Sequence, residues 1–394
     1  MERWQRALSE SITSLDELSR YIPIDSKLLG PVVARYPLRI TRTYLSLIRE
    51  KDDPIWRQSV PDRRELEQDD LSIDPLNEEN LTCVPGLIHR YPDRVVLLVS
   101  SVCPTLCRFC TRKNRMGGEG SLKNQSSSKN VIPAKAGIQK VLKALDSRRS
   151  LPRTSIRGGS DELIINRGYH QNSLEAALGY IETKPAIREV ILSGGDPLLL
   201  TDDELEDILI RVRKIPHLEV VRIHTRAPVT LPERITFRLC RILKQYHPLY
   251  LNTQFNHPIE ITPLSANACA RLADAGIPLG NQTVLLRGVN DDPEVMKRLM
   301  QKLLTIRVRP YYIHQMDLVK GTGHFRTSVQ KGLDIVEQLR GHTSGMATPS
   351  YVIDLPGGKG KVAVLPDDVR RQGNNLFLRN YLGEITEYPD GEEE

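Results

Sequence analysis

The amino-acid sequence predicts an α/β fold in which helices surround a parallel sheet. Apolar runs of strand length alternate with amphipathic stretches of helical length, and clusters of polar residues follow the strand-like runs. Such an alternation is typical of βα units, which build a parallel sheet with helices outside it. Since the strand-like runs number six rather than the eight of a closed barrel, we expect an open, partial barrel.

The strand-like runs are short, apolar and rich in β-branched residues. They begin at residues 94, 188, 218, 249, 277 and 308. Helical stretches with one apolar face begin at residues 173, 202, 233, 265 and 293. Asp202 and Ser265 stand at the starts of two of these stretches and are predicted to be helix N-caps.

Three regions are predicted along the chain. Residues 1–85 form a helical and irregular lead-in, whose clearest helix is "SLDELSRYI" (14–22). Residues 86–345 hold the partial barrel, and residues 346–394 form a C-terminal extension.

A basic stretch interrupts the barrel after its first strand. Residues 121–160 contain five Lys and four Arg against one Asp, a net charge of +8, so the rest of the chain carries −2 of the total of +6. The stretch has no aromatic residue and no sustained period, which predicts a disordered insertion over about 119–166. An RNA-binding arm is the alternative, disfavoured because stacking aromatics are missing. Overall basicity therefore does not indicate a nucleic-acid partner.

Three of the six cysteines, Cys103, Cys107 and Cys110, follow the first strand with C-x3-C-x2-C spacing. Charged residues between them disfavour an apolar core segment, and the scattered positions of the other three disfavour a disulfide framework. Structural zinc normally takes four ligands, and the chain has no second C-x2-C pair. With no signal peptide and no apolar run of membrane length, we expect a reducing, cytoplasmic location and no membrane partner.

Three thiolates suit a [4Fe–4S] cluster that leaves one iron open to a small molecule, chelated through an amine and a carboxylate. The loop after a parallel strand is where such folds place their chemistry. Spacing and position together resemble the radical S-adenosylmethionine superfamily. This resemblance implies a partial TIM-like barrel, S-adenosylmethionine at the fourth iron, and cleavage of that cofactor to a radical.

Two glycine-rich motifs follow other strands. In "SGGDP" (193–197), Gly194 and Gly195 would let backbone approach a ligand and Asp196 would face a cation, although a turn with a helix cap is the structural alternative. In "IDLPGGKGKVAVLP" (353–366), a lysine follows a glycine turn. It could be a surface residue, part of a phosphate loop, or a lysine that condenses with an aldehyde cofactor; no G-x4-G-K-[ST] pattern is present.

Nearly all of the chain outside residues 119–166 resembles the lysine 2,3-aminomutases. The matching runs include "VPGLIHRYPDRVVLL", "LSGGDPLL", "FNHPIEIT", "DAGIPLGNQTVLLRGVND", "IRVRPYYIHQMDL" and "DLPGGKGK". The resemblance implies an isomerase that moves the amino group of L-lysine from C2 to C3 to give β-lysine. It also implies pyridoxal 5′-phosphate as a third cofactor, held in the C-terminal extension.

Site residues follow from the resemblance position by position. Lys361 falls on the pyridoxal phosphate lysine, with Arg90 and Tyr91 beside the ring and phosphate. Arg112 falls on the arginine for the substrate carboxylate, and Asp317 with Asp354 on the pair for the ε-ammonium. S-adenosylmethionine is expected to meet Ser193, Gly194, Gly195, Asp196 and Gln282.

Departures from the family pattern also carry expectations. Lys359 replaces a frequent glycine, and Phe109 and Gln254 stand where many relatives have histidine. Asp292 replaces a cysteine that helps to bind zinc in some relatives, and the C-terminus lacks the matching cysteines, so we expect no zinc.

Several alternatives stay open from sequence. They are an aminomutase acting on another amino acid such as glutamate, a lysine aminomutase serving translation elongation factor P modification, and a non-catalytic iron–sulfur protein. The family also implies a one-electron donor such as flavodoxin or ferredoxin, and a homo-oligomer is compatible with it.

Overall fold

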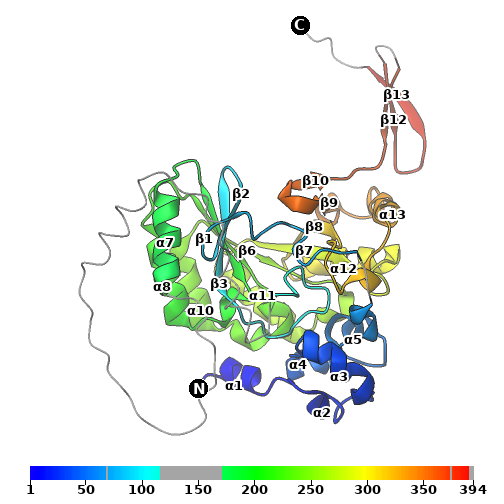
Figure 1. The fold of residues 1–394 in the computed structure, drawn as a ribbon. Coiled ribbons are helices and arrows are strands. Elements are labelled where there is room, and N and C mark those ends of the chain that lie inside the picture. The colour runs from blue at the N-terminus through cyan, green and yellow to red at the C-terminus, as the bar shows by residue number, and fades with distance from the viewer. Residues whose placement is uncertain (68–69, 116–170, 373–374, 390–394) are drawn as a thin grey trace, which may run out of the picture.

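The computed structural model describes residues 1–67, 70–115, 171–372 and 375–389 (Figure 1). The predicted insertion at 119–166 lies outside these residues. Within them, no helix combines the length and the apolar character that crossing a membrane requires.

The centre of the molecule is a ten-stranded sheet whose strands follow one another in chain order from β1 to β10 (Figure 1). Strands β3 to β9 run parallel, whereas β1, β2 and β10 join the edges antiparallel. The strands are β1 Thr82–Val84, β2 Leu87–Tyr91, β3 Arg94–Ser100, β4 Glu189–Gly194, β5 Val220–His224, β6 Leu249–Thr253, β7 Leu279–Leu285, β8 Arg309–Gln315, β9 Ser350–Asp354 and β10 Lys361–Ala363. The predicted α/β fold with a parallel sheet is confirmed.

The six predicted strands correspond to β3 to β8. The structure adds β9 as a further parallel strand, which the sequence analysis placed in the C-terminal extension without assigning it to the sheet. The run "SYVID" is as long as β5 and β6, and its parallel pairing with β8 places it in the sheet.

Helices lie outside the sheet (Figure 1). The lead-in contains α1 Arg3–Ser9, α2 Leu15–Leu18, α3 Ser26–Arg35, α4 Arg42–Leu45 and α5 Pro54–Ser59. The barrel carries α7 Gln171–Glu182, α8 Asp202–Arg213, α9 Ala227–Thr230, α10 Phe237–Leu243, α11 Pro263–Asp274, α12 Pro293–Thr305 and α13 Val329–Leu339. The run "SLDELSRYI" forms a helix over only four residues. The lead-in and the barrel share one hydrophobic core, to which Ile40 and Tyr44 contribute beside Val95 and Leu97.

Two predicted N-caps are wrong by one and three positions. Thr201 caps α8, because its side chain accepts the amide hydrogen of Glu204, and Asp202 is the first helical residue. Thr262 caps α11 in the same way and is followed by proline at the first helical position. Threonine with a capping partner three residues later satisfies the free amides at both starts.

Strand β3 shows how the sheet separates core from cavity. Val95, Leu97 and Val99 are buried in the core, while Arg94 and Val96 alternate with them and line a cavity on the opposite face. This two-residue period is the ordinary consequence of strand geometry. The cavity-lining side chains of β3 therefore lie on the face of the sheet turned away from the helices.

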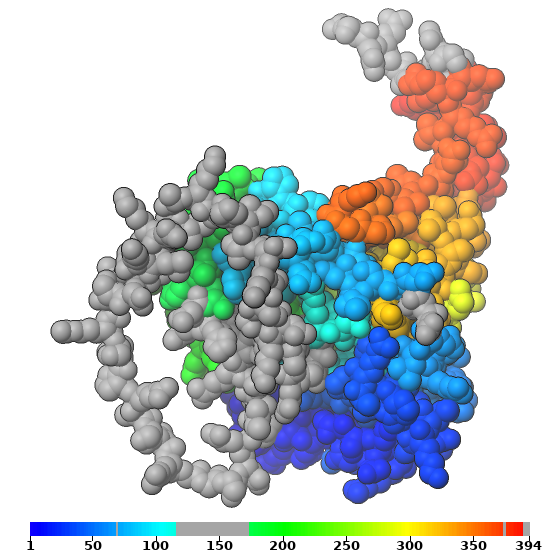
Figure 2. All heavy atoms as spheres, viewed as in Figure 1, coloured from blue at the N-terminus to red at the C-terminus, as the bar shows by residue number. Residues whose placement is uncertain are grey.

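The C-terminal residues form a separate antiparallel sheet of β11 Val369–Gln372, β12 Asn375–Arg379 and β13 Ile385–Pro389. It extends away from the body of the molecule (Figure 2). Ion pairs between Arg340 and Asp368 and between Arg379 and Glu337 connect it to the end of α13.

Candidate functional site

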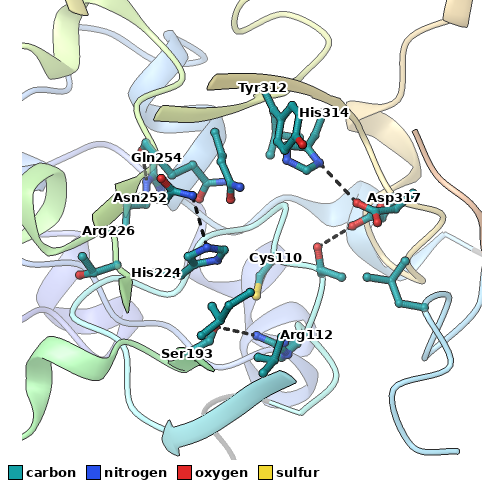
Figure 3. A pocket seen from close by; sticks show the side chains of 18 of the residues that line it. Cys110, Arg112, Ser193, His224, Arg226, Asn252, Gln254, Tyr312, His314 and Asp317 are labelled. Carbon is teal, nitrogen blue, oxygen red and sulfur yellow. Dashed lines mark hydrogen bonds and ion pairs between the residues drawn. The ribbon is translucent and has the colours of Figure 1, made fainter. Parts of the chain in front are cut away.

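A cavity of about 740 Å³ lies at the carboxyl ends of the parallel strands. Every residue for which the sequence predicted a cofactor, metal or substrate contact lines it; Figure 3 shows part of its wall. Those residues are Arg90, Tyr91, Cys103, Cys107, Cys110, Arg112, Ser193, Gly194, Gly195, Asp196, Gln282, Asp317, Asp354 and Lys361. The sheet therefore gathers these residues into one space.

The three cysteines lie on the loop that leaves β3. All three line both the main cavity and a second, smaller one of about 50 Å³ on the side of the lead-in. Burial raises the pKa of the Cys103 thiol well above its ordinary value and that of Cys110 to about 11. Uncharged thiols tolerate such a site, and thiolates there need compensating positive charge, which an iron cluster supplies.

Among the described residues, no three His, Cys, Asp or Glu converge on a position for a single metal ion. The donor set is three cysteines alone, spread around a space. Such a set fits a cubane, whose iron corners hold the thiolates apart, better than mononuclear zinc.

Buried ion pairs fix the cysteine loop to the lead-in. Arg108 and Lys113 are charged residues of this loop, and both are buried against Glu65. Arg108 also donates to the carbonyl oxygens of Tyr36 and Pro37. Burial lowers the pKa of Lys113 to about 8, against the raising effect of Glu65. Contacts with the lead-in therefore hold the cysteine loop in its conformation.

Gly194 and Gly195 are required by the cysteine loop itself. A Cβ on Gly194 would lie 2.2 Å from the carbonyl oxygen of Ser100, and one on Gly195 would lie 2.4 Å from that of Val102. The backbone amide of Gly195 donates to Ser100, at 2.6 Å. The sequence predicted that these glycines let backbone approach a ligand. In the structure they let the end of β4 approach the backbone of Ser100 and Val102.

Asp196 takes the structural role that was the alternative in sequence. Its carboxylate caps a 3₁₀ turn at the amide of Leu198 and accepts hydrogen bonds from Thr225 Oγ1 at 2.7 Å and the Arg226 amide at 2.9 Å. Burial raises its pKa, against the lowering effect of these hydrogen bonds. Asp196 joins the ends of β4 and β5.

Asp354 is surrounded by three basic side chains. Its carboxylate lies 2.5 Å from Lys361 Nζ, 3.2 Å from Arg90 Nη1 and 3.4 Å from His314 Nδ1. Burial alone would raise its pKa, but the hydrogen bond from His314 and the charge of Lys361 hold the pKa well below its usual range. Asp354 is therefore ionised at every physiological pH.

Asp317 is the second carboxylate of this wall, and its electrostatics differ. Its Oδ2 accepts a hydrogen bond from Thr111 Oγ1 at 2.7 Å (Figure 3). Burial, together with the neighbouring Asp354 charge, raises its pKa to about 6, against the lowering effect of the Thr111 hydrogen bond. Two carboxylates on one wall attract a cation.

Arg112 makes a bidentate ion pair with Glu78, at 2.7 and 2.8 Å. Its remaining nitrogen, Nη1, lies 3.4 Å from both Ser193 Oγ and the Gly194 carbonyl oxygen. The fork predicted to bind a substrate carboxylate is thus held in place by Glu78, and Nη1 is the donor turned toward the end of β4.

The glycine turn distinguishes its two lysines. Gly357, Gly358 and Gly360 all have positive φ, and a Cβ on Gly358 would meet the Leu76 carbonyl oxygen at 2.8 Å. Lys361 begins β10 opposite Asp354 and lines the cavity, whereas Lys359 is exposed and does not.

Sequence reasoning missed several residues of the cavity wall. His224 ends β5 and His314 lies near the end of β8, and the sequence analysis gave neither a role. Burial lowers the pKa of His224 to about 3, which makes it a neutral ring. Arg226, two residues beyond His224, contacts Cys107. Glu78 lies in the predicted lead-in, where no local pattern marks it.

Comparison with known proteins gives matches over nearly the full chain. A family model described as "Lysine-2,3-aminomutase" matches residues 336–394. The L-lysine 2,3-aminomutase of Clostridium subterminale is 45% identical over 98% of this chain and 83% of its own length, and that of Fusobacterium nucleatum is 43% identical over 99% and 82%. A glutamate 2,3-aminomutase of Clostridioides difficile is 41% identical over 98% and 82%.

Proposed function

The chain belongs to the lysine 2,3-aminomutase family, whose members are isomerases, and we propose that it moves the amino group of L-lysine from C2 to C3. The observation that carries the choice of lysine is the pair Asp317 and Asp354 on one wall of the cavity. A glutamate side chain would place a third carboxylate beside them, which like-charge repulsion disfavours.

We further propose that the open ten-stranded sheet is the partial barrel of a radical S-adenosylmethionine enzyme. The lead-in over 1–85 contributes β1 to this sheet, the barrel region over 86–345 contributes β2 to β8, and the C-terminal extension over 346–394 contributes β9 and β10. The linear strand order, with no pairing between β1 and β10 in the described residues, supports an open barrel.

The cavity residues fit three cofactors. Cys103, Cys107 and Cys110 would hold a [4Fe–4S] cluster, and Lys361 with Arg90 and Tyr91 would hold pyridoxal phosphate. The end of β4 and Gln282 would hold S-adenosylmethionine. When bound, these groups supply a radical that removes hydrogen from the substrate and a π system that lets its nitrogen migrate.

The protein's own residues position the substrate. Arg112 Nη1 would meet the α-carboxylate, while Asp317 and Asp354 would meet the ε-ammonium, so that lysine is held at both ends. An electron enters from a donor of the flavodoxin or ferredoxin class.

The proposal is tested by anaerobic reconstitution with iron, sulfide, S-adenosylmethionine and pyridoxal phosphate, followed by assay on L-lysine and L-glutamate. We expect β-lysine as the main product. Faster turnover of glutamate would contradict the assignment of the two aspartates, and a reconstituted cluster without any turnover would favour the non-catalytic alternative.

Pyridoxal phosphate is expected to attach to Lys361 rather than Lys359, because only Lys361 lines the cavity. Borohydride reduction and peptide mapping should find the phosphopyridoxyl group on Lys361. The matched variant Lys359→Ala should keep this labelling, and Lys361→Ala should lose it. A label on Lys359 in the unaltered protein would refute the assignment.

Lysine binding should weaken as the pH falls through about 6. Asp317 has its pKa raised to about 6, so it is ionised above that pH and neutral below it, where its attraction for the ε-ammonium is lost. One pH unit below the pKa about a tenth of the protein is competent, so the Kd should rise about tenfold.

Calorimetric titration of the anaerobic holoenzyme with L-lysine measures this dependence. Asp317→Asn should bind lysine weakly at every pH, without the rise in Kd below pH 6. Norleucine, which lacks the ε-ammonium, serves as the ligand control, and its Kd should not rise below pH 6 in either protein. A pH-independent Kd for lysine in the unaltered protein would contradict the role of Asp317.

A further inference from the structure

Arg226 places a buried guanidinium directly against one of the three cysteines. It follows β5 at the start of α9, and its Nη1 donates to Cys107 Sγ at 2.7 Å. Its Nε donates to the Gln254 carbonyl oxygen at 3.1 Å. The side chain is 9% exposed, so solvent screens this charge little.

Fixed partners hold the other end of the guanidinium. Nη2 lies 2.7 Å from both Gln58 Oε1 and Glu260 Oε1. The Glu260 side chain is fully buried, and its second oxygen accepts from the backbone amides of Asn256 and His257. Tyr44 donates to Glu260 at 2.6 Å, which completes the network.

Arg226 and Glu260 form a buried ion pair whose positive member faces Cys107. The positive group touches the sulfur of Cys107, and the negative group lies on the other side of the guanidinium, held by backbone amides. Nη2 also donates to Tyr44 Oη at 3.1 Å, so the guanidinium cannot turn away from Cys107 without losing its hydrogen bonds to Gln58, Glu260 and Tyr44. No step of the substrate positioning described above uses Arg226.

Resting on the proposed cluster at Cys103, Cys107 and Cys110, we infer that Arg226 is a positioning residue that raises the cluster's reduction potential through its N–H···S bond to Cys107. One-electron reduction adds a negative charge to the cluster, with flavodoxin, ferredoxin or dithionite as the donor oxidised. A cationic donor on a ligand sulfur stabilises the reduced form more than the oxidised one. Glu260 offsets part of this effect.

Two charge substitutions should therefore move the potential in opposite directions. Arg226→Gln removes the positive charge and should shift the midpoint potential to more negative values. Glu260→Gln leaves the guanidinium uncompensated and should shift it to more positive values. We expect each shift to reach about 59 mV, a tenfold change in the one-electron equilibrium. General loosening of the loop would not produce opposite signs.

The measurement is a mediated redox titration of the reconstituted protein, followed by electron paramagnetic resonance, without substrate. Iron and sulfide content are determined for each variant. Arg222→Gln is the matched control. Arg222 lies on β5, four residues before Arg226, lines the same cavity and pairs with Glu189, with no cysteine contact in the described structure. The potential shift of Arg222→Gln should be much smaller.

The outcomes separate this inference from the proposed function. If the unaltered protein binds no cluster, the proposed function fails. If it binds one and the shifts of Arg226→Gln and Glu260→Gln share a sign or do not exceed that of the control, the role of Arg226 is wrong. If Arg226→Gln assembles no cluster, the midpoint potential is measured instead in Arg226→Lys, which keeps the positive charge, and in Glu260→Gln. An unshifted potential in Glu260→Gln overturns the inference.

Discussion

Replacing Cys107 by alanine should abolish cluster binding and reduce β-lysine formation to background. Three thiolates are the smallest set that holds a cubane while leaving one iron open, so two cannot retain it. The loop itself should persist, because Glu65, Arg108 and Lys113 hold it through ion pairs that do not involve sulfur. Iron content should fall from about four per chain to near zero, while the melting temperature changes little.

The control for this loss is a cysteine outside the loop. Cys269 is buried in the core on α11, far along the sequence from the cavity-lining cysteines, and Cys269→Ala should keep full iron content. An intact cluster in Cys107→Ala would show that its ligands lie elsewhere. A collapsed fold in that variant would show instead that sulfur packing at this position is structural.

Replacing Asp354 by asparagine should produce the second large effect, a loss of lysine turnover by tenfold or more. Asp354 lies against Arg90, His314 and Lys361, so its removal leaves buried positive charge uncompensated. Removing one member of a buried charge pair costs on the order of 2 to 5 kcal/mol, and about 1.4 kcal/mol already corresponds to a factor of ten. The loss should appear in kcat/KM for lysine.

Asp62→Asn is a useful comparison for Asp354→Asn. Asp62 is a carboxylate in an ion pair with Arg64 in the lead-in, outside the cavity lining, and its replacement should leave kcat/KM within a few-fold of normal. If Asp354→Asn keeps normal lysine turnover, the ammonium is bound elsewhere. If it gains glutamate turnover in place of lysine, charge at this wall selects the substrate as proposed.

Sequence reasoning reached the strands because each carries its own local signal, an apolar run of fixed length. The helix starts were less well placed. Threonine and aspartate both favour N-cap positions, so local pattern does not separate Thr201 from Asp202, and only the hydrogen bond from Glu204 identifies Thr201 as the cap. Strand β9 is as long as β5 and β6, so its length does not explain why it was missed; its place in the sheet follows from its pairing with β8.

The candidate site divides in a similar way. Cys103, Cys107 and Cys110 could be predicted from sequence because their spacing is local, and Lys361 because a glycine turn precedes it. The contact between Arg226 and Cys107 joins residues 119 positions apart, and Arg112 meets Glu78 across 34. Such pairs depend on how strands are ordered in the sheet, which no local pattern contains.

The anchoring of the cysteine loop bears on how the protein is matured and maintained in a cell. Backbone bonds from Leu106 to Arg39 and from Arg108 to Gln58 join the loop to the lead-in, beside the buried Glu65. Small zinc domains, in contrast, fold only when their metal arrives. Because these contacts do not involve sulfur, we expect the polypeptide to fold first and receive iron afterwards. On this expectation, a chain that loses its cluster to oxygen stays folded and can be loaded with iron again instead of being synthesised anew.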